Sequence, residues 1–168
     1  MDVPILQDKK VFYDHRGYFA PVDLTQLERP WVQSNVSFNT KRLTLRGLHF
    51  QTGEYAQAKL VKVIQGKIVD FIYDMRPSSL TYKELFIYDM EPGQELFVPK
   101  NFAHGFITTE DNTIVQYLVD NIYHPESEGS IVWTKFLPLM QKFNTIPDFN
   151  VHDIVINDKD LVTKNFND

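Results

Sequence analysis

Short runs of β-branched and aromatic residues recur along the chain and alternate with turn residues. The runs cover 59–64, 67–74, 84–90, 94–99, 105–109 and 113–119, and turn residues lie at 65–66, 91–93 and 110–112. This alternation predicts antiparallel hairpins, with chain reversals at Gly66 and Gly93. Residues 43–133 are therefore expected to form a sandwich or barrel, and the predicted fold class is all-β.

Helical periodicity is weak throughout the sequence. Short helices are predicted only around 23–28 and around 157–164. The chain has 168 residues, 43% of them hydrophobic, and shows no internal repeat or linker. This length fits one domain spanning 1–168, large enough to bury a substantial core.

Two polar residues interrupt the apolar pattern. Asp70 lies inside a run that otherwise has the composition of a buried strand, and His104 lies between Ala103 and Gly105 in an apolar stretch. An unpaired buried carboxylate is costly, so Asp70 should have a partner such as a histidine or lysine. Spacing alone leaves His104 open as either a structural core histidine or a functional one.

Charge and cysteine content narrow the possible functions. The formal net charge is -5 and the pI is about 5.5, which argues against a generally basic nucleic-acid or membrane surface. An anionic ligand must then be held by locally placed cations. The absence of cysteine excludes disulfides, thiolate metal sites and a cysteine nucleophile, and is compatible with a reducing cytoplasm. Without a signal-like or membrane-spanning apolar run, a cytoplasmic protein is expected.

One segment concentrates groups suited to an anionic substrate and to proton transfer. Arg46, His49 and Lys59 bring a guanidinium, an imidazole and an ammonium to predicted strand positions within fourteen residues. Each also has a plain interpretation, as a surface cation, a polar residue at a strand edge or a solvated strand start. The spacing itself leaves these alternatives open.

Several motifs occur together in the same chain. They read RGLHFQ at 46–51, AQAKLV at 56–61 and PKNFAHGF at 99–106, with further matches at 15–19, 32–35, 74–79 and 123–126. In this combination the sequence resembles the dTDP-4-dehydrorhamnose 3,5-epimerases over about residues 12–161. The resemblance implies a cupin-type jelly-roll barrel of antiparallel strands, a homodimer with strand exchange, a nucleotide-diphosphate 4-keto sugar as substrate, and neither a cofactor nor a metal.

The resemblance also assigns roles to individual residues. His49 matches the general base and Asp160 the carboxylate that orients it. Tyr117 matches the acid on the opposite face of the sugar, and Lys59 the cation near the C4 oxygen. The positions that match other substrate contacts are His104 paired with Asp70, Arg16, Gln33, Asn35, Arg46, Tyr123, Glu128 and Lys159. Plain alternatives remain for the tyrosines, as barrel aromatics, and for Asp160, as a helix cap.

These residue types suit the implied reaction. A ketone at C4 acidifies the hydrogens on C3 and C5, so a base can remove one if the enolate is stabilised electrostatically. Inversion then needs a proton donor on the other face. A histidine, a tyrosine and a nearby cation meet this requirement without a redox cofactor.

The chain departs from the family pattern at two places. Pro21 stands where a nucleotide-contacting glutamate is usual, which leaves the nucleobase and the local pocket open. The choice between single and double epimerisation also stays open, because it depends on the placement of Tyr117 and on the freedom of the sugar ring to flip. Trp133-Thr134-Lys135 replaces the usual WND. Neither departure changes the expected base, acid or His/Asp pair, so the expected reaction class is less affected than the substrate identity.

Three other functions compete with epimerisation. A metal-dependent cupin would use a His-x-His pair, but the five histidines at 15, 49, 104, 124 and 152 contain none. A sugar-nucleotide 3,4-ketoisomerase on the same barrel would share an enediol intermediate. A non-catalytic carbohydrate-binding barrel would not require a complete set of base, acid and orienting carboxylate.

Overall fold

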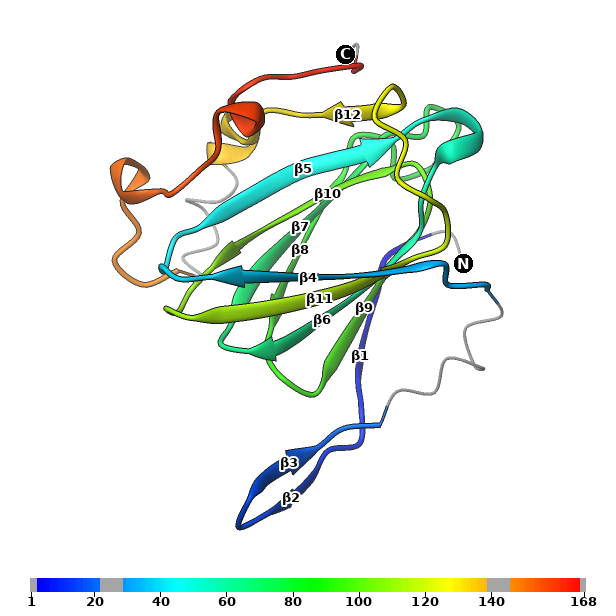
Figure 1. Cartoon of the computed structure of the whole chain (residues 1–168). Coiled ribbons are helices and arrows are strands. Elements are labelled where there is room, and N and C mark those ends of the chain that lie inside the picture. Colours follow the sequence, from blue (N-terminus) through cyan, green and yellow to red (C-terminus); the bar gives the residue numbers. More distant parts are fainter. Residues whose placement is uncertain (1–2, 22–28, 139–145, 167–168) are drawn as a thin grey trace.

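Two five-stranded antiparallel sheets face each other in a computed structural model that describes residues 3–21, 29–138 and 146–166 (Figure 1). One sheet has the order β1 (Ile5–Asp8), β9 (Gln94–Val98), β6 (Lys59–Gln65), β11 (Thr113–Val119) and β4 (Gln33–Asn39). The other has the order β12 (Glu128–Ser130), β5 (Leu45–Gln51), β10 (Phe102–Thr108), β7 (Ile68–Asp74) and β8 (Leu85–Met90). The predicted all-β jelly roll is confirmed.

Strands β6 to β11 lie where the six apolar runs predicted them, but the predicted hairpins are wrong at all three short turns. Gly66 and Gly93 do reverse the chain, with φ of 78° and 97°. The turns at 65–66, 91–93 and 110–112 nevertheless each join a strand of one sheet to a strand of the other. A local pattern shows where a chain reverses, whereas the pairing partner depends on which buried face each strand must cover. These crossings close the two sheets into one barrel.

Strand β7 shows how the sheets divide the interior. Ile68, Asp70 and Ile72 alternate with Val69 and Phe71, and side chains two apart point to the same face of a strand. The first set faces the space between the sheets, where Ile68 and Ile72 join the core. The second set packs beneath the C-terminal part of the chain. Asp70 is therefore a carboxylate inside the barrel.

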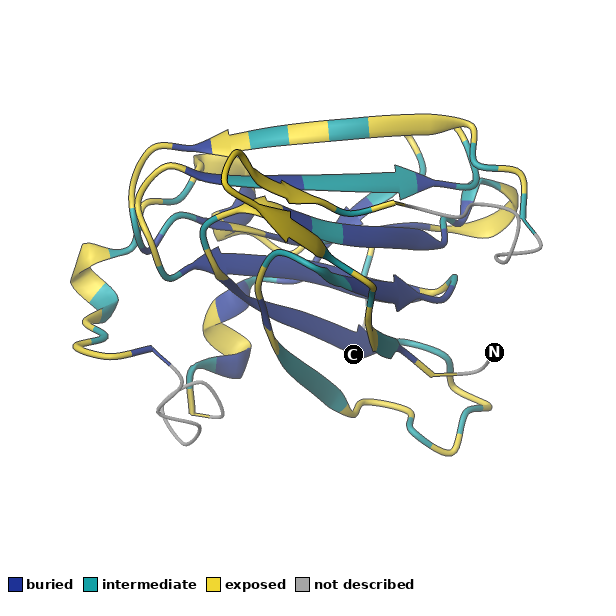
Figure 2. Ribbon diagram, turned by 90° about the horizontal axis from the view of Figure 1, so that it is seen from below, coloured by how far each residue is buried: buried dark blue, intermediate teal, exposed yellow. Residues whose placement is uncertain are grey.

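Burial differs sharply between central and peripheral strands (Figure 2). Every residue of β7 and β10 is buried, whereas β4, at the end of its sheet, has several exposed residues. The strands β2 (Phe12–Asp14) and β3 (Gly17–Phe19) form a separate hairpin that projects from the barrel (Figure 1). All six of its strand residues are exposed.

Four short 3-10 helices lie in the described ranges: η2 (Gly53–Tyr55), η3 (Trp133–Phe136), η4 (Val151–Asp153) and η5 (Asp158–Leu161). The helical turn expected around 157–164 is confirmed as η5, and η3 contains the Trp133-Thr134-Lys135 departure. The helix predicted at 23–28 falls outside the described residues. Within the described residues, no helix has the length and apolar character needed to cross a membrane.

The C-terminal segment is fastened across the outer end of β5. The Leu45 N–H donates to the Val155 carbonyl at 2.9 Å, and the Val155 N–H donates to the Leu43 carbonyl at 2.9 Å. This attachment brings η5 next to the strand that carries His49.

Candidate active site

A cavity of about 400 Å³ opens inside the barrel beside β5 and η5. It adjoins a second cavity of about 360 Å³, and His49, Lys59, Tyr117 and Lys159 line both. The two cavities therefore form one elongated site with the catalytic candidates at its middle. Such a shape suits a ligand with two chemically different halves.

His49 and Asp160 form a close pair at this midpoint. The Nε2 atom of His49 lies 2.6 Å from Oδ1 of Asp160, and the backbone N–H of Gly47 donates to Oδ2 at 3.3 Å. Asp160 is 3% exposed. Burial raises the pKa of Asp160, but its hydrogen bonds and the charge of His49 outweigh burial and leave that pKa below its usual value. The carboxylate is thus ionised at neutral pH.

The alternative of Asp160 as a helix cap is wrong. The residue that caps η5 is Asn157, whose side chain accepts a hydrogen bond from the backbone N–H of Lys159. Asp160 lies in the third position of the helix and points its carboxylate at the imidazole. A carboxylate in this geometry fixes the ring and stabilises a positive charge that develops on it.

A second His/Asp pair lies one strand away. Nε2 of His104 is 2.8 Å from Oδ2 of Asp70, which is fully buried. This confirms the prediction that the buried carboxylate has a polar partner. Burial raises the pKa of Asp70 and lowers the pKa of His104, because both charged forms are desolvated.

Two glycines let the strands that carry the histidines approach closely. His49 and His104 are cross-strand partners of β5 and β10. A Cβ atom on Gly47 would lie 2.6 Å from the His104 carbonyl oxygen, and one on Gly105 would lie 2.6 Å from the Arg46 carbonyl oxygen. Only glycine fits at either position without displacing the neighbouring backbone, so the motif glycines set the spacing of the two pairs.

Lys59 is a buried cation beside these pairs. Its ammonium donates to the carbonyl oxygen of His49 at 3.3 Å. Desolvation lowers the pKa of Lys59 to about 8, against the opposing effect of the Asp70 and Glu128 charges. Below that pH, Lys59 supplies a positive charge in a low-dielectric environment, where it acts strongly on a developing oxyanion.

Tyr117 lies in the middle of β11 and lines both cavities. Burial raises the pKa of its phenol, with the Arg46 charge acting to lower it and the Glu128 charge to raise it. The hydroxyl therefore carries its proton at neutral pH and can donate it. Asn35 is its cross-strand partner on β4 and faces the same side of the sheet.

The predicted substrate-binding residues divide between the two cavities. Arg46 and His104 line the first, and the residues that line the second are Gln33, Asn35, Tyr123, Glu128 and Lys159, the last shared with the first cavity. Gln33 donates to Asn35 Oδ1 at 2.6 Å, and the Tyr123 hydroxyl donates to Glu128 Oε2 at 3.1 Å. These residues thus lie together at one site, and their contacts with a substrate stay a prediction.

Arg16 lies outside both cavities, as does the fully buried Asp70. Arg16 lies at the turn of the β2–β3 hairpin, where its guanidinium pairs with Asp14 at 2.6 Å. The predicted contact of Arg16 with the nucleotide is not made within the cavities of a single chain and stays a prediction. Its side chain is 79% exposed.

The prediction missed several polar residues at the site, among them Asn39, Gln51 and Gln57. Asn39 is buried and accepts a hydrogen bond from Arg46 Nε at 2.7 Å, which fixes the direction of the guanidinium. Gln51 and Gln57 line the second cavity. Gln51 was visible as the last letter of RGLHFQ, whereas nothing in the sequence marks Asn39. Among the described residues, no group of three or more His, Cys, Asp or Glu side chains could hold a metal ion.

Comparison with known proteins identifies the family of this fold and site. The family profile described as dTDP-4-dehydrorhamnose 3,5-epimerase matches residues 2–168. The chain belongs to this family. It is 40% identical to the dTDP-4-dehydrorhamnose 3,5-epimerase of Escherichia coli K12 over 141 residues, which cover 79% of this chain and 75% of the relative. It is 41% identical to that of Methanothermobacter thermautotrophicus over 142 residues, again with 79% and 75% coverage.

Solved structures agree with this assignment. The Bacillus anthracis dTDP-4-dehydrorhamnose 3,5-epimerase, determined with TDP and PPi bound, is 36% identical, with a TM-score of 0.82 over 95% of this chain and 92% of that one. The Legionella pneumophila enzyme, in complex with dTDP-4-keto-L-rhamnose, is 27% identical, with a TM-score of 0.79 over 95% and 86% of the two chains. The present chain is thus a nucleotide-sugar epimerase with the cupin-type fold of its family.

Proposed function

We propose that this epimerase inverts C3 and C5 of a dTDP-linked 4-keto-6-deoxyhexose of the dTDP-4-dehydro-6-deoxyglucose type, for the synthesis of deoxysugars. The observation that carries the proposal is the His49–Asp160 pair, with 2.6 Å between Nε2 and Oδ1, at the midpoint of a cavity that Lys59 and Tyr117 also line. Base, orienting carboxylate, cation and proton donor converge there. A binding module has no need of all four.

The reaction follows from the charges of these groups. With the Nε2 proton donated to Asp160, the Nδ1 atom of His49 is the free base and removes the hydrogen from C3 or C5. The electrons of the broken C–H bond move into the C4 carbonyl, and the ammonium of Lys59 stabilises the enolate oxygen. Tyr117 then returns a proton to the same carbon from the other face, which inverts it. Solvent then takes the abstracted proton from His49 and reprotonates the tyrosine.

The nucleotide half of the substrate is assigned to the second cavity. Gln33, Asn35 and Glu128 offer amide and carboxylate groups there, and the Tyr123 ring offers a stacking surface for the base. Arg46 and Lys159 supply cations for the diphosphate. His104, buried with Asp70, lines the sugar end and can contact a sugar oxygen.

Proton NMR in D₂O tests the reaction. The enzyme, treated with EDTA, is incubated with dTDP-4-dehydro-6-deoxyglucose and separately with its guanosine analogue. Deuterium at C3 and C5 with inverted coupling constants supports the proposal, and deuterium at C3 alone would reassign the chain as a single-site epimerase. A shift of the keto group from C4 to C3 would favour the ketoisomerase, and no exchange with either nucleotide would refute nucleotide-sugar epimerisation of these substrates.

We further propose a homodimer in which the β2–β3 hairpin reaches the site of the second copy. The hairpin projects from the barrel and exposes 74% of Tyr13 and 66% of Phe19, more aromatic surface than an isolated hairpin keeps in water. Its Arg16, remote from the cavities of its own chain, would then supply a cation to the partner's diphosphate site.

Such an enzyme would work in the cytoplasm, in keeping with its lack of cysteine.

Subunit complementation tests this arrangement. The variants Arg16→Ala and His49→Ala are purified separately, mixed under conditions that exchange subunits, and assayed for epimerisation. Recovery of activity supports a shared site, because the mixed dimer has one site with His49 and the hairpin of its partner intact. Mass spectrometry shows whether mixed dimers have formed. If they have formed and activity does not recover, the shared site is refuted.

A further inference from the structure

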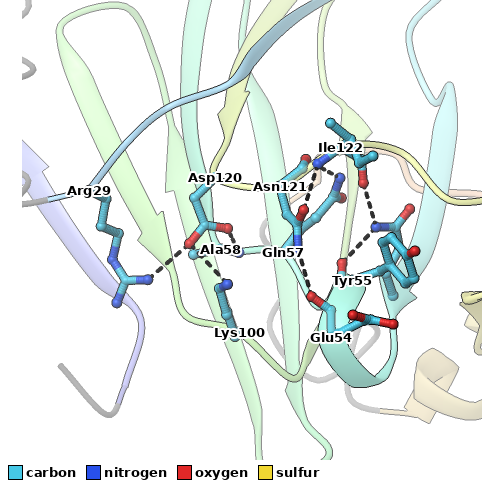
Figure 3. A network of polar contacts seen from close by, with 10 residues as sticks. Arg29, Glu54, Tyr55, Gln57, Ala58, Lys100, Asp120, Asn121 and Ile122 are labelled. Carbon is cyan, nitrogen blue, oxygen red and sulfur yellow. Dashed lines mark hydrogen bonds and ion pairs between the residues drawn. The ribbon is translucent and has the colours of Figure 1, made fainter.

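The loop 120–127, which carries Tyr123, is fastened to the barrel at its start (Figure 3). Asp120, with a side chain only 5% exposed, accepts a hydrogen bond from the Ala58 N–H at 2.7 Å and pairs with Arg29 at 3.0 Å and Lys100 at 3.5 Å. The next residue, Asn121, donates its side-chain amide to the Glu54 carbonyl at 2.8 Å. The entry to the loop is thus fixed independently of any ligand.

Gln51 fastens the same loop on both sides of Tyr123. Its Nε2 donates to the carbonyl oxygens of Tyr55 at 2.7 Å and of Ile122 at 3.0 Å. Its Oε1 accepts from the backbone N–H of His124 at 2.8 Å. The carbonyl of the residue before Tyr123 and the N–H of the residue after it are therefore both held by one side chain, which is 4% exposed.

Neighbouring contacts complete the attachment. The rings of Tyr55 and His124 stack with centroids 3.8 Å apart and 7° between their planes. His124 Nδ1 lies 2.9 Å from the Ser127 hydroxyl oxygen, and the Thr52 N–H donates to the Ser127 carbonyl at 3.0 Å. Tyr55 and the loop residue after Tyr123 thus form one unit with the end of β5.

From this geometry we propose that Gln51 is a positioning residue that holds Tyr123 in the orientation needed to bind the nucleotide. The inference rests on the proposed function, which assigns the nucleotide to the second cavity. Gln51 lines that cavity, but both its amide hydrogens and its oxygen are already engaged by backbone groups, so it acts through the loop. Tyr123 is itself 52% exposed and bonded to Glu128, and its packing alone is too slight to fix its backbone.

The expected effect is on binding. Without Gln51, the Tyr123 segment samples orientations that must be ordered when the nucleotide binds, and that ordering lowers affinity. Loss of these three partly buried hydrogen bonds should weaken dTDP binding by roughly tenfold. Proton transfer takes place at His49 in the middle of the site, so kcat at saturating substrate should change little and the effect should appear in KM.

A double-mutant cycle tests the proposal. The affinity for dTDP is measured by calorimetry for the wild type, Gln51→Leu, Tyr123→Ala and the double variant, with kcat and KM for each. Gln51→Glu is a second variant of the same shape; it keeps the acceptor for the His124 N–H and loses both donations. Gln65→Leu is the matched control. Gln65 is an exposed glutamine whose side chain donates to the backbone carbonyl of Asn112, and it lines neither cavity.

The proposal predicts a roughly tenfold loss for Gln51→Leu, and in the Tyr123→Ala background no further loss. Gln65→Leu should bind dTDP like the wild type. Wild-type affinity in Gln51→Leu, or independent losses that add in the double variant, would overturn the inference and leave the proposed function standing. If Gln51→Leu does not fold, the same comparison is made with Gln51→Glu. A wild-type enzyme that binds no dTDP would refute the proposed nucleotide site, and the inference with it.

Discussion

Replacement of Asp160 by asparagine should slow epimerisation without impairing substrate binding. The amide can still accept a hydrogen bond from His49 Nε2, but it has no charge to stabilise the imidazolium that forms when the base takes a proton. A hydrogen bond to a charged group contributes about 1.5–3 kcal/mol. At about 1.4 kcal/mol per tenfold in rate, kcat should fall roughly 10- to 150-fold. KM should change little, because the carboxylate contacts the base.

Deuterium exchange at C3 and C5, followed by NMR under single-turnover conditions, measures this effect on the chemical step directly. Asp160→Ala should lose more, since it removes orientation as well as charge and leaves the Gly47 N–H without its acceptor. Asp158→Asn, an exposed position on the same short helix, is the matched control and should exchange like the wild type. An exchange rate for Asp160→Asn within a factor of about three of wild type would refute the reasoning, since the loss expected from charge alone is larger.

Three further outcomes follow from the site. Activity should fall as pH rises through about 8, because the pKa of Lys59 lies there and deprotonation removes the cation that stabilises the enolate. The Lys59→Met variant should have a low kcat, and its pH profile should lack this alkaline decline. A decline that persists in this variant would show that another group titrates there. Tyr117→Phe should still exchange deuterium but invert poorly, whereas equal loss of exchange and inversion would contradict separate base and acid roles. His104→Ala should lower the unfolding free energy in urea by about 3–5 kcal/mol, because it leaves the buried carboxylate of Asp70 unpaired; a loss below about 1 kcal/mol would refute this.

The sequence predicted β6 to β11 because each of these strands carries its own apolar signature. It failed at the connections: the turn at Gly66 looks the same whether the next strand returns beside β6 or crosses to the other sheet. That choice depends on contacts between residues far apart in the sequence, which the pattern of a short segment does not contain. The β2–β3 hairpin was not predicted, because its two strands are only three residues long and all six residues are exposed, so they show no alternation of buried and exposed positions.

The candidate site divides in the same way. Asp70 could be recognised from its position alone, since a carboxylate inside an apolar strand demands a partner. The pairing of His49 with Asp160 could not, because 111 residues separate them and only the resemblance connected the two. The roles of Asn39 and Gln51 needed coordinates, since each acts by orienting a neighbour. A positioning role of this kind has no composition signal of its own.

The separation of His49 from Asp160 also has a consequence in time. At translation rates of about 5–20 residues per second, the ribosome adds Asp160 roughly 6 to 22 s after His49. By then all the barrel strands have been synthesised, because the last of them, β12, ends at Ser130. Val155, Ile156 and Lys159, in the same C-terminal segment as Asp160, line the first cavity, so both the oriented base and the complete cavity require this segment to dock on β5.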